Sequence, residues 1–374
     1  MKIDSIQYMR GLAAVIVVVA HAFEHQIADE NFTLLRLGSL GVVMFFVISG
    51  FIMVLISGES SFGAAIFLRR RFVRVVPLYW LATAAIAILA LLAPSLLRRT
   101  TFAVDDLVLS LFFIPHYDSA GGLAPMLTLG WTLNYEIFFY LCFAMVSSFT
   151  AGVRVAAVSL AFAGMIALGE ISNFSNPLLQ FYTRPIVGAF CIGMWVGLAT
   201  IRGRSLRGQR RSQIVAGIIA VTFTAAAFLI QPGVRGNWQV TYAFAFGSAA
   251  LLLLAVGAEG RIPTSRLALL LGDSSYSLYL SHMYAVAAAI IVMRRFGNSH
   301  NLLLNGAVAI VGGIVLGILV HKLVEKPLLV FLKSPRRRQE MIGSSANPVL
   351  PREGEPLALQ PREQGKEDTV VVQP

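Results

Sequence analysis

Apolar residues dominate this chain in runs of about 20 residues, and short polar clusters separate the runs. A run of this length can cross the hydrocarbon core of a bilayer as an α-helix. A weaker run, 104–116, is too short to cross and is expected to lie at the interface or to re-enter the membrane. The pattern therefore predicts an all-α, polytopic membrane protein with about ten transmembrane helices, over residues 6–27, 38–57, 73–93, 129–149, 153–170, 178–200, 213–230, 238–257, 276–293 and 303–323.

Composition and loop charge agree with a membrane protein. Hydrophobic residues make up 57% of the chain and charged residues 13%, with a mean hydropathy of +0.74, which excludes an ordinary soluble domain. The basic runs 67–74, 202–211 and 334–338 fall on one side of the predicted topology. By the positive-inside rule that side is the cytoplasm, and both termini lie there, as expected for a multi-pass protein of the cytoplasmic membrane. Four arginines fall on the outer side and oppose this assignment: Arg98, Arg99, Arg294 and Arg295.

Net charge, cysteine positions and the composition of the C-terminal residues give three further expectations. The net charge of +11 is explained mostly by the inner loops, so no nucleic-acid partner is expected. Cys142 and Cys191 both lie in apolar runs and are expected to pack rather than to form a disulfide or bind a metal. We expect a membrane-embedded domain over 1–332 and a disordered, polar and basic cytoplasmic tail over 333–374.

The first apolar run contains two polar residues on one helical face. Eleven residues separate Arg10 from His21. At about 100° per residue they lie within about 20° of each other, about 16 Å apart along the axis. An arginine inside a membrane costs about 2.5–3.5 kcal/mol on insertion scales, so this face is expected to border a cavity rather than lipid.

Six strings, in order over residues 1–332, resemble the acyltransferase 3 family of integral-membrane acyltransferases. They are IDSIQYMRGLAAVIVVVAHA (3–22, with the Arg-x10-His spacing), GVVMFFVISGFIM (41–53), FLRRRFVRVVPLYW (67–80), LGWTLNYEIFFYL (129–141), LGDSSYSLYLSH (271–282) and VEKP (324–327). The SIQYMRG start is most similar to the branch that acylates exopolysaccharide.

This resemblance implies a membrane O-acyltransferase, an enzyme that moves an acyl group, usually acetyl from acetyl-CoA, to a hydroxyl of a carbohydrate. It implies acyl-CoA as co-substrate, with no permanently bound cofactor. The implied acceptor is an exported polysaccharide or its lipid-linked precursor. Membrane lipid and polysaccharide-assembly proteins are further partners that it suggests.

The resemblance also assigns roles to residues. His21 matches the essential histidine of the family, either as the general base for the acceptor hydroxyl or as a covalent acyl carrier, and both remain open. A histidine that only bonds a neighbouring helix is the structural alternative. Arg71 and Arg74 match the basic motif before Pro77 and are expected to bind the donor, because guanidinium groups bind phosphate in a bidentate way. The alternative is that inner loops are basic in any membrane protein.

Arg10 is expected either to hold a donor phosphate or to extend to the inner interface. Glu136, an intramembrane carboxylate near the outer end of its span, is expected to be catalytic by orienting His21 or binding acceptor hydroxyls. A structural hydrogen bond to Arg184 or another polar group is the alternative for Glu136. Four residues are assigned to the acceptor path: Trp131, Asn134, Tyr276 and His282, of which His282 fits a core histidine equally well.

Two structural expectations concern helix contacts. Gly41, Ser49 and Gly50 are expected to allow close helix packing, because small residues let backbones approach in lipid. Glu325 is expected to anchor a helix end by pairing with Lys322 or Lys326.

Two other functions fit parts of the sequence. His21, Glu24 and His25 spell H-x-x-E-H, which could hold zinc in an intramembrane hydrolase, although the sequence offers no clear further carboxylate ligand. Because the resemblance explains His21 without a metal, no metal site is expected. A transporter or flippase for a lipid-linked sugar would also suit ten helices with buried charges, but it needs no thioester donor.

Overall fold

A computed structural model describes residues 3–24, 32–97, 100–119, 121–203, 209–230, 238–295 and 301–332. The chain divides into two compact units, Met1–Val330 and Phe331–Pro374. All structure reported below belongs to the first unit. The predicted tail over 333–374, as well as Arg98, Arg99 and His25, lies outside the described residues.

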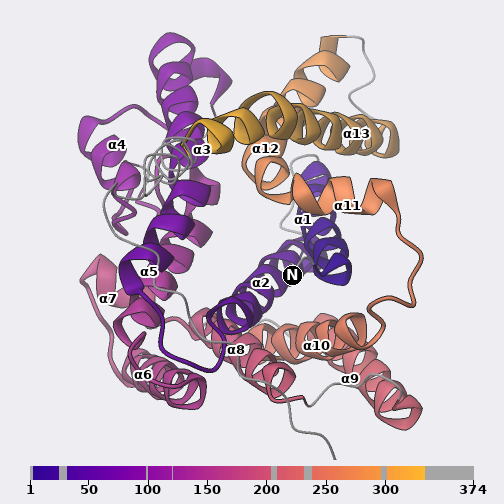
Figure 1. Cartoon of the computed structure of the whole chain (residues 1–374). Helices are drawn as coiled ribbons and strands as arrows, with labels where there is room; N and C mark the ends of the chain where they lie inside the picture. Colours follow the sequence, from indigo (N-terminus) through magenta and orange to yellow (C-terminus); the bar gives the residue numbers. More distant parts are fainter. Residues whose placement is uncertain are drawn as a thin grey trace, which may run out of the picture. The chain divides into compact units, whose positions relative to one another are not determined.

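The described residues form an all-α, multi-pass membrane protein. Eight helices are long and apolar enough to cross a membrane (Figure 1). They are α1 (Asp4–Glu24), α2 (Phe32–Ser57), α3 (Ala64–Leu92), α6 (Ala151–Ile171), α9 (Arg210–Leu229), α10 (Trp238–Gly257), α12 (Ser275–Arg295) and α13 (Leu302–Val320), the last continued by a π-helical turn, His321–Glu325. No strand occurs in the described ranges, where Tyr117 and Leu123 form an isolated β-bridge.

Two of the ten predicted spans are shorter helices. The run 129–149 forms a 3₁₀ turn, Thr128–Gly130, followed by α5 (Trp131–Met145), which has 15 residues. The run 178–200 divides into α7 (Pro177–Tyr182), a 3₁₀ turn at Pro185–Val187 and α8 (Gly188–Ile201). Pro177 and Pro185 each start one of these pieces, since proline suits the first turn of a helix but removes a backbone donor further along. A 15-residue helix is about 22 Å long, less than the bilayer core of about 30 Å.

The run 104–116, predicted to be too short to cross a membrane, contains a helix of eight residues. This helix is α4 (Val104–Leu111), which lies against α3. Tyr79 donates a hydrogen bond to the Ser110 carbonyl over 3.1 Å, and the Trp80 indole N–H donates to the Leu111 carbonyl over 2.9 Å.

Glycines permit the closest helix contacts, and the predictions for Gly41 and Gly50 are confirmed. A Cβ on Gly50 would collide with the Phe190 carbonyl of α8, and one on Gly193 of α8 would collide with the Val47 carbonyl of α2. A Cβ on Gly41 would lie 2.7 Å from the Ala13 carbonyl of α1. The backbones of α1, α2 and α8 therefore pack directly on one another.

One end of the helices is held together by a buried arginine. Arg154, in the first turn of α6, donates to the carbonyls of Gly58, Ser60 and Phe149 over 2.5–2.8 Å. These carbonyls belong to the loops after α2 and α5, so the α2–α3 and α5–α6 loops lie at the same end. Arg202, after α8, joins them through a 2.9 Å salt bridge to Glu59.

Contacts at other helix ends show which helices run in opposite directions. At the start of α2, Arg36 donates to the carbonyls of Phe228 and Ile230 at the end of α9. At the start of α1, the Glu259 carboxylate accepts from the N–H groups of Asp4 and Ser5, each over 3.0 Å. Glu259 follows α10, so α10 ends where α1 begins, and the short helix α11 (Arg266–Asp273) then packs along α1 (Figure 1).

Candidate active site

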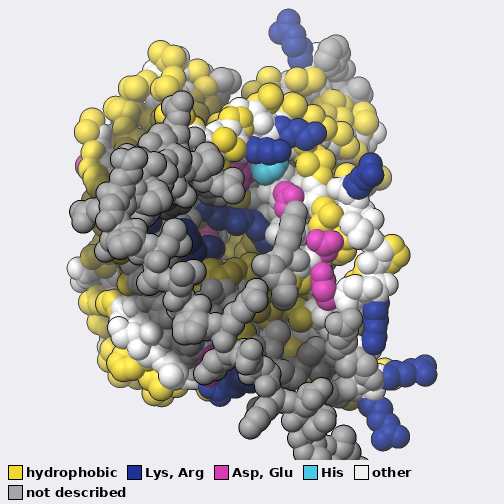
Figure 2. Space-filling view, viewed as in Figure 1, with side chains coloured by type: hydrophobic (Ala, Val, Ile, Leu, Met, Phe, Trp, Pro, Cys, Tyr) yellow, Lys and Arg dark blue, Asp and Glu magenta, His cyan; other side chains and the backbone are white. Residues whose placement is uncertain are grey.

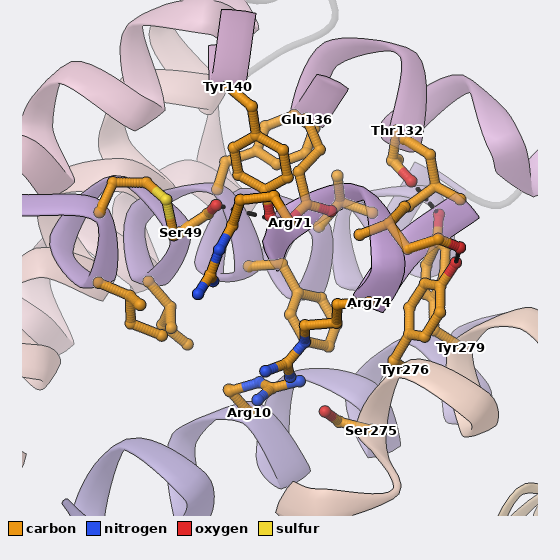
Figure 3. Close-up of a pocket in the computed structure, with 18 residues that line it drawn as sticks. Arg10, Ser49, Arg71, Arg74, Thr132, Glu136, Tyr140, Ser275, Tyr276 and Tyr279 are labelled. Atoms are coloured by element: carbon orange, nitrogen blue, oxygen red, sulfur yellow. Dashed lines mark hydrogen bonds between the residues drawn. The ribbon is translucent and has the colours of Figure 1, made fainter. Parts of the chain in front are cut away.

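A cavity of about 100 Å³, lined by both polar and apolar side chains, lies between α1, α2, α3, α5 and α12 (Figure 3). This volume exceeds the 10–15 Å³ that a single water requires, so the cavity can hold several waters or a small ligand group. Figure 2 shows Lys and Arg side chains in a hollow near the middle of the drawn face, between the positions of α5 and α1 in Figure 1. Ten of the lining residues carry polar groups: Arg10, Ser49, Arg71, Arg74, Thr132, Glu136, Tyr140, Ser275, Tyr276 and Tyr279.

The charges in this cavity are unequal. Three guanidinium groups, from Arg10, Arg71 and Arg74, line it together with a single carboxylate, Glu136, among the described lining residues. Arg10 comes from α1 and the other two from α3, where a spacing of three residues places them on one face. Arg10 and Arg74 point toward each other in Figure 3 and repel electrostatically, while Glu136 attracts Arg10. The Arg71 Nε atom is buried with no hydrogen-bond partner.

Glu136 is fixed from two sides. The Tyr140 hydroxyl, one turn further along α5, donates to its Oε1 atom, and the Ser49 hydroxyl of α2 lies 3.4 Å from the same atom. Glu136 also interacts electrostatically with Arg71. Glu136 therefore lies in the cavity, beside the arginines of α3.

Two tyrosines of α12 line the cavity, and the hydroxyl group of each forms hydrogen bonds with other helices. Tyr276 donates to the Val75 carbonyl of α3 over 2.7 Å, next to Arg74 in sequence. The Tyr279 hydroxyl lies 2.8 Å from the Thr132 hydroxyl and 3.1 Å from the Leu129 carbonyl. These bonds fix α12 to α3 and to the start of α5.

His21 and His282 lie next to each other outside the residues that line the cavity. The His21 Nδ1 atom is 3.4 Å from the His282 Nε2 atom, and the ring centroids are 5.1 Å apart. His282, on α12, is fully buried, and His21 is half-buried in the last turn of α1.

Tyr279 connects the cavity and the histidine pair. Its ring lines the cavity, and its centroid is 6.1 Å from the His282 ring. Phe45 of α2 also lines the cavity and meets the Tyr279 ring edge-on at 6.0 Å. Arg10 and His21, on one face of α1, thus belong to two neighbouring sites.

The other predicted site residues are placed differently. Trp131 begins α5 and packs edge-on against Tyr135. Asn134 is buried, and neither of its amide atoms has a hydrogen-bond partner. No group of three or more His, Cys, Asp or Glu residues that could hold a metal occurs within the described ranges.

Glu325 is predicted to anchor a helix end by pairing with Lys322 or Lys326, but the structure pairs it with Ser277 and His321 instead. Glu325 is buried in the π-helical turn and accepts from the Ser277 hydroxyl over 2.5 Å, with His321 Nδ1 at 2.8 Å. It also interacts electrostatically with Arg10. The spacing of four residues between His321 and Glu325 places them on one face, which is the signal that the sequence offered.

Several cavity residues had no predicted role at the site. Tyr140 follows Glu136 by four residues and could have been found from that spacing. Ser49 was grouped with the packing glycines of α2, yet it lies at the cavity. Thr132, Ser275 and Tyr279 lie within the strings 129–141 and 271–282 that carry the family resemblance, and this was the signal that the sequence offered.

Comparisons with known proteins bear on this site. Residues 3–322 match a family model described as an acyltransferase domain. The chain is 33% identical over 319 residues to "Exopolysaccharide production protein ExoZ" of Rhizobium meliloti (strain 1021), covering 83% of this chain and 93% of the relative. It is 29% identical over 154 residues to "Acyltransferase MdmB" of Streptomyces mycarofaciens, covering 38% of this chain and 39% of the relative. No solved structure matches the chain.

Proposed function

Because the chain belongs to the acyltransferase 3 family of integral-membrane acyltransferases, we propose that it transfers acetyl from acetyl-CoA to a hydroxyl of an exported polysaccharide or its lipid-linked precursor. The name of the Rhizobium relative supports the class of acceptor. Acetyl-CoA is made in the cytoplasm, so the proposed location is the cytoplasmic membrane, with the basic loops facing the donor.

The observation that carries the proposal is the excess positive charge of the cavity. Three guanidinium groups line the cavity with one carboxylate, Glu136, and the buried carboxylate of Glu325 also attracts Arg10. Positive groups remain in excess in a site between membrane helices, where an unbalanced charge is costly. An anionic ligand would restore the balance, and Arg71 has a buried Nε–H group ready to donate. The phosphate groups of coenzyme A match guanidinium groups in charge and geometry, so we assign Arg10, Arg71 and Arg74 to donor binding.

The histidine pair supplies the base for the transfer. A hydroxyl is a poor nucleophile at neutral pH, and a positioned general base accelerates its attack by about 10²–10⁴-fold. In the proposed step, His21 takes the proton of the acceptor hydroxyl while the hydroxyl oxygen attacks the thioester carbonyl carbon. The C–S bond breaks, the new C–O ester bond remains, and the leaving thiolate of coenzyme A takes the proton back from His21.

The position of the two sites suggests a route for the acyl group. Arg10 and His21 are about 16 Å apart along α1, and the long pantetheine arm of coenzyme A separates its phosphates from its thioester in the same way. The thioester would pass Tyr279, which contacts both sites. We therefore propose that the donor enters from the cytoplasmic end and that the acceptor meets His21 nearer the outer end.

Glu136 and the remaining residues have supporting roles in this proposal. Glu136, held by Tyr140 and Ser49, orients the guanidinium groups against their mutual repulsion. Tyr276 fixes the wall of the donor cavity through its bond to α3. Trp131 and Asn134, at the start of α5, are proposed to face the acceptor path.

The proposal is tested by transfer of radiolabelled acetyl from acetyl-CoA to glycan. The purified protein, reconstituted in lipid vesicles, is incubated with labelled acetyl-CoA and lipid-linked glycan from its source organism. Vesicles without protein serve as the control. We expect label in the glycan that mild alkali releases, because an ester is base-labile. Label that stays in acetyl-CoA or appears only as free acetate would contradict the proposal.

A further inference from the structure

Two histidines from helices far apart in sequence meet with defined ring atoms facing each other. His21 Nδ1 of α1 and His282 Nε2 of α12 are separated by 3.4 Å. The third helix of this contact is α13, where a Cβ on Gly313 would lie 3.5 Å from the His282 Cβ atom. Val18 and Leu278, each about one turn before the histidine of its own helix, belong to one apolar cluster.

The hydrogen bonds define the tautomer of His282. Its Nδ1 atom lies 3.1 Å from the Leu278 carbonyl, one turn earlier on α12. A carbonyl oxygen only accepts hydrogen bonds, so Nδ1 carries the proton in the neutral ring. The Nε2 atom then has a lone pair, and this atom faces His21.

The same reasoning defines the tautomer of His21. Its Nδ1 atom lies 2.9 Å from the Val17 carbonyl as well as 3.4 Å from His282 Nε2. The Val17 carbonyl only accepts hydrogen bonds, so this contact favours the His21 tautomer that carries its proton on Nδ1, from which the ring can also donate to His282 Nε2. The lone pair of His21 is then on Nε2, the atom that must accept a proton from a substrate.

We propose that His282 is the positioning partner of His21, which it holds in the tautomer that can act as a base. This inference rests on the proposed function. As His21 gains the acceptor proton on Nε2, its Nδ1–H group donates more strongly to His282 Nε2 and to the Val17 carbonyl. The positive charge of the imidazolium is thereby stabilised, and His282 stays neutral because two imidazolium rings in contact would repel.

Two amide variants of His282 separate this role from a packing role. His282→Asn places its amide at the reach of Nδ1, where it can bond the Leu278 carbonyl but not His21. His282→Gln is one methylene longer, so its amide reaches the position of Nε2 and can accept from His21. Ser281→Ala, on the same helix, serves as a control because its hydroxyl bonds within α12, to the Ser277 carbonyl.

The expected result concerns turnover rather than donor binding. We expect kcat to fall by about 10²-fold in His282→Asn and by about 10-fold or less in His282→Gln. The KM for acetyl-CoA stays near the wild-type value in both, because the donor phosphates bind in the arginine cavity. Equal losses in the two variants, wild-type activity in His282→Asn, or a raised KM in place of a lowered kcat would overturn the inference.

A spectroscopic measurement tests the inference without activity. Solid-state NMR of ¹⁵N-histidine-labelled protein in lipid reports which ring nitrogen carries the proton, and the His21 and His282 variants assign the signals among the six histidines. We expect both rings as the Nδ1–H tautomer. An Nε2–H tautomer at His21 would overturn the inference. A wild-type protein that transfers no acetyl would contradict the proposed function alone.

Discussion

At the scale of the residue, the direction in which an arginine of α3 points decides what it can bind. Arg71 and Arg74 line the cavity, whereas Arg69 is exposed and lies about 160° around the helix from Arg71. All three belong to the same basic run, so topology alone would treat them alike. The donor-binding proposal treats them differently.

We therefore predict that Arg71→Gln and Arg74→Gln weaken binding of acetyl-CoA, while Arg69→Gln does not. A hydrogen bond to a charged group contributes about 1.5–3 kcal/mol, equivalent to about 10–100-fold in Kd. Isothermal titration of coenzyme A into the purified protein measures this. The proposal fails if Arg69→Gln weakens binding as much as the two cavity variants.

Some positions of the site could be predicted from the sequence, and others could not. Helical periodicity placed Arg10 and His21 on one face, and resemblance selected Arg71 and Arg74, which the structure brings together with Arg10. The contact between His21 and His282 could not be predicted, because 261 residues separate them and no local pattern encodes their meeting. The same holds for the bond between Ser277 and Glu325.

At the scale of the element, glycines set how closely the helices approach. Gly193 of α8 lies directly against the backbone of α2, whereas a Cβ on Gly164 of α6 would meet nothing within 4 Å. We predict that Gly193→Ala lowers the unfolding free energy by about 1–3 kcal/mol, as overpacking does. Gly164→Ala is expected to leave stability unchanged or slightly raised, since alanine is the better helix former.

Thermal unfolding of both variants in the same detergent checks this prediction. Because each change adds one methyl group to a helix, the comparison isolates the effect of the α2–α8 contact. Equal melting temperatures for the two variants would show that this contact tolerates a Cβ.

The start of α1 is stabilised by Glu259. Desolvation raises the pKa of Glu259, but hydrogen bonds from Ser5 and Asp4 lower it, and the pKa lies below its ordinary value of 4.5. The folded protein therefore favours the carboxylate, and this contribution to stability is present above pH 4.5 and is lost as the pH falls through the lowered pKa. A carboxylate at a helix N-terminus also interacts favourably with the helix dipole.

We predict that Glu259→Gln melts at a lower temperature than the wild type at neutral pH. The gap between the two should shrink as the pH falls below 4.5, where the wild-type carboxylate gains its proton. Melting curves over a pH series measure the gap, and other titrating groups largely cancel in the difference. A gap that stays constant or widens on acidification would contradict the role of the carboxylate.

At the scale of the element, hydropathy predicts apolar runs but not where helices begin and end within them. Eight predicted spans are long helices, but the runs at 129–149 and 178–200 are broken into shorter pieces. Hydropathy averages over a window and does not report where Pro177 and Pro185 start new helices. The run 178–200 is therefore divided into α7 and α8 with a 3₁₀ turn between them.

At the scale of the whole molecule, the order of helix ends predicts a topology. The loops that Arg154 joins lie at one end with the basic run of α3, and the α6–α7 connection follows the opposite end of α6. By the positive-inside rule the first end faces the cytoplasm. The exposed residues Ser60 and Ser175 mark the two sides.

We predict that S175C reacts with a membrane-impermeant thiol reagent in cells whose cytoplasmic membrane is intact, and that S60C does not. Both changes are made in a protein with Cys142 and Cys191 replaced by alanine. After the membrane is permeabilised, S60C is expected to react as well. Reaction of S60C in intact cells would reverse the topology and place the arginine cavity on the wrong side for acetyl-CoA.

The central claim is that donor binding and acyl transfer occur at two neighbouring sites, the arginine cavity and His21. The most direct test measures both properties in His21→Ala, at matched protein level: acetyl transfer to glycan and the Kd for coenzyme A. The account predicts that transfer falls by at least about 10²-fold while the Kd stays near the wild-type value. Transfer that continues at the wild-type rate would contradict the account.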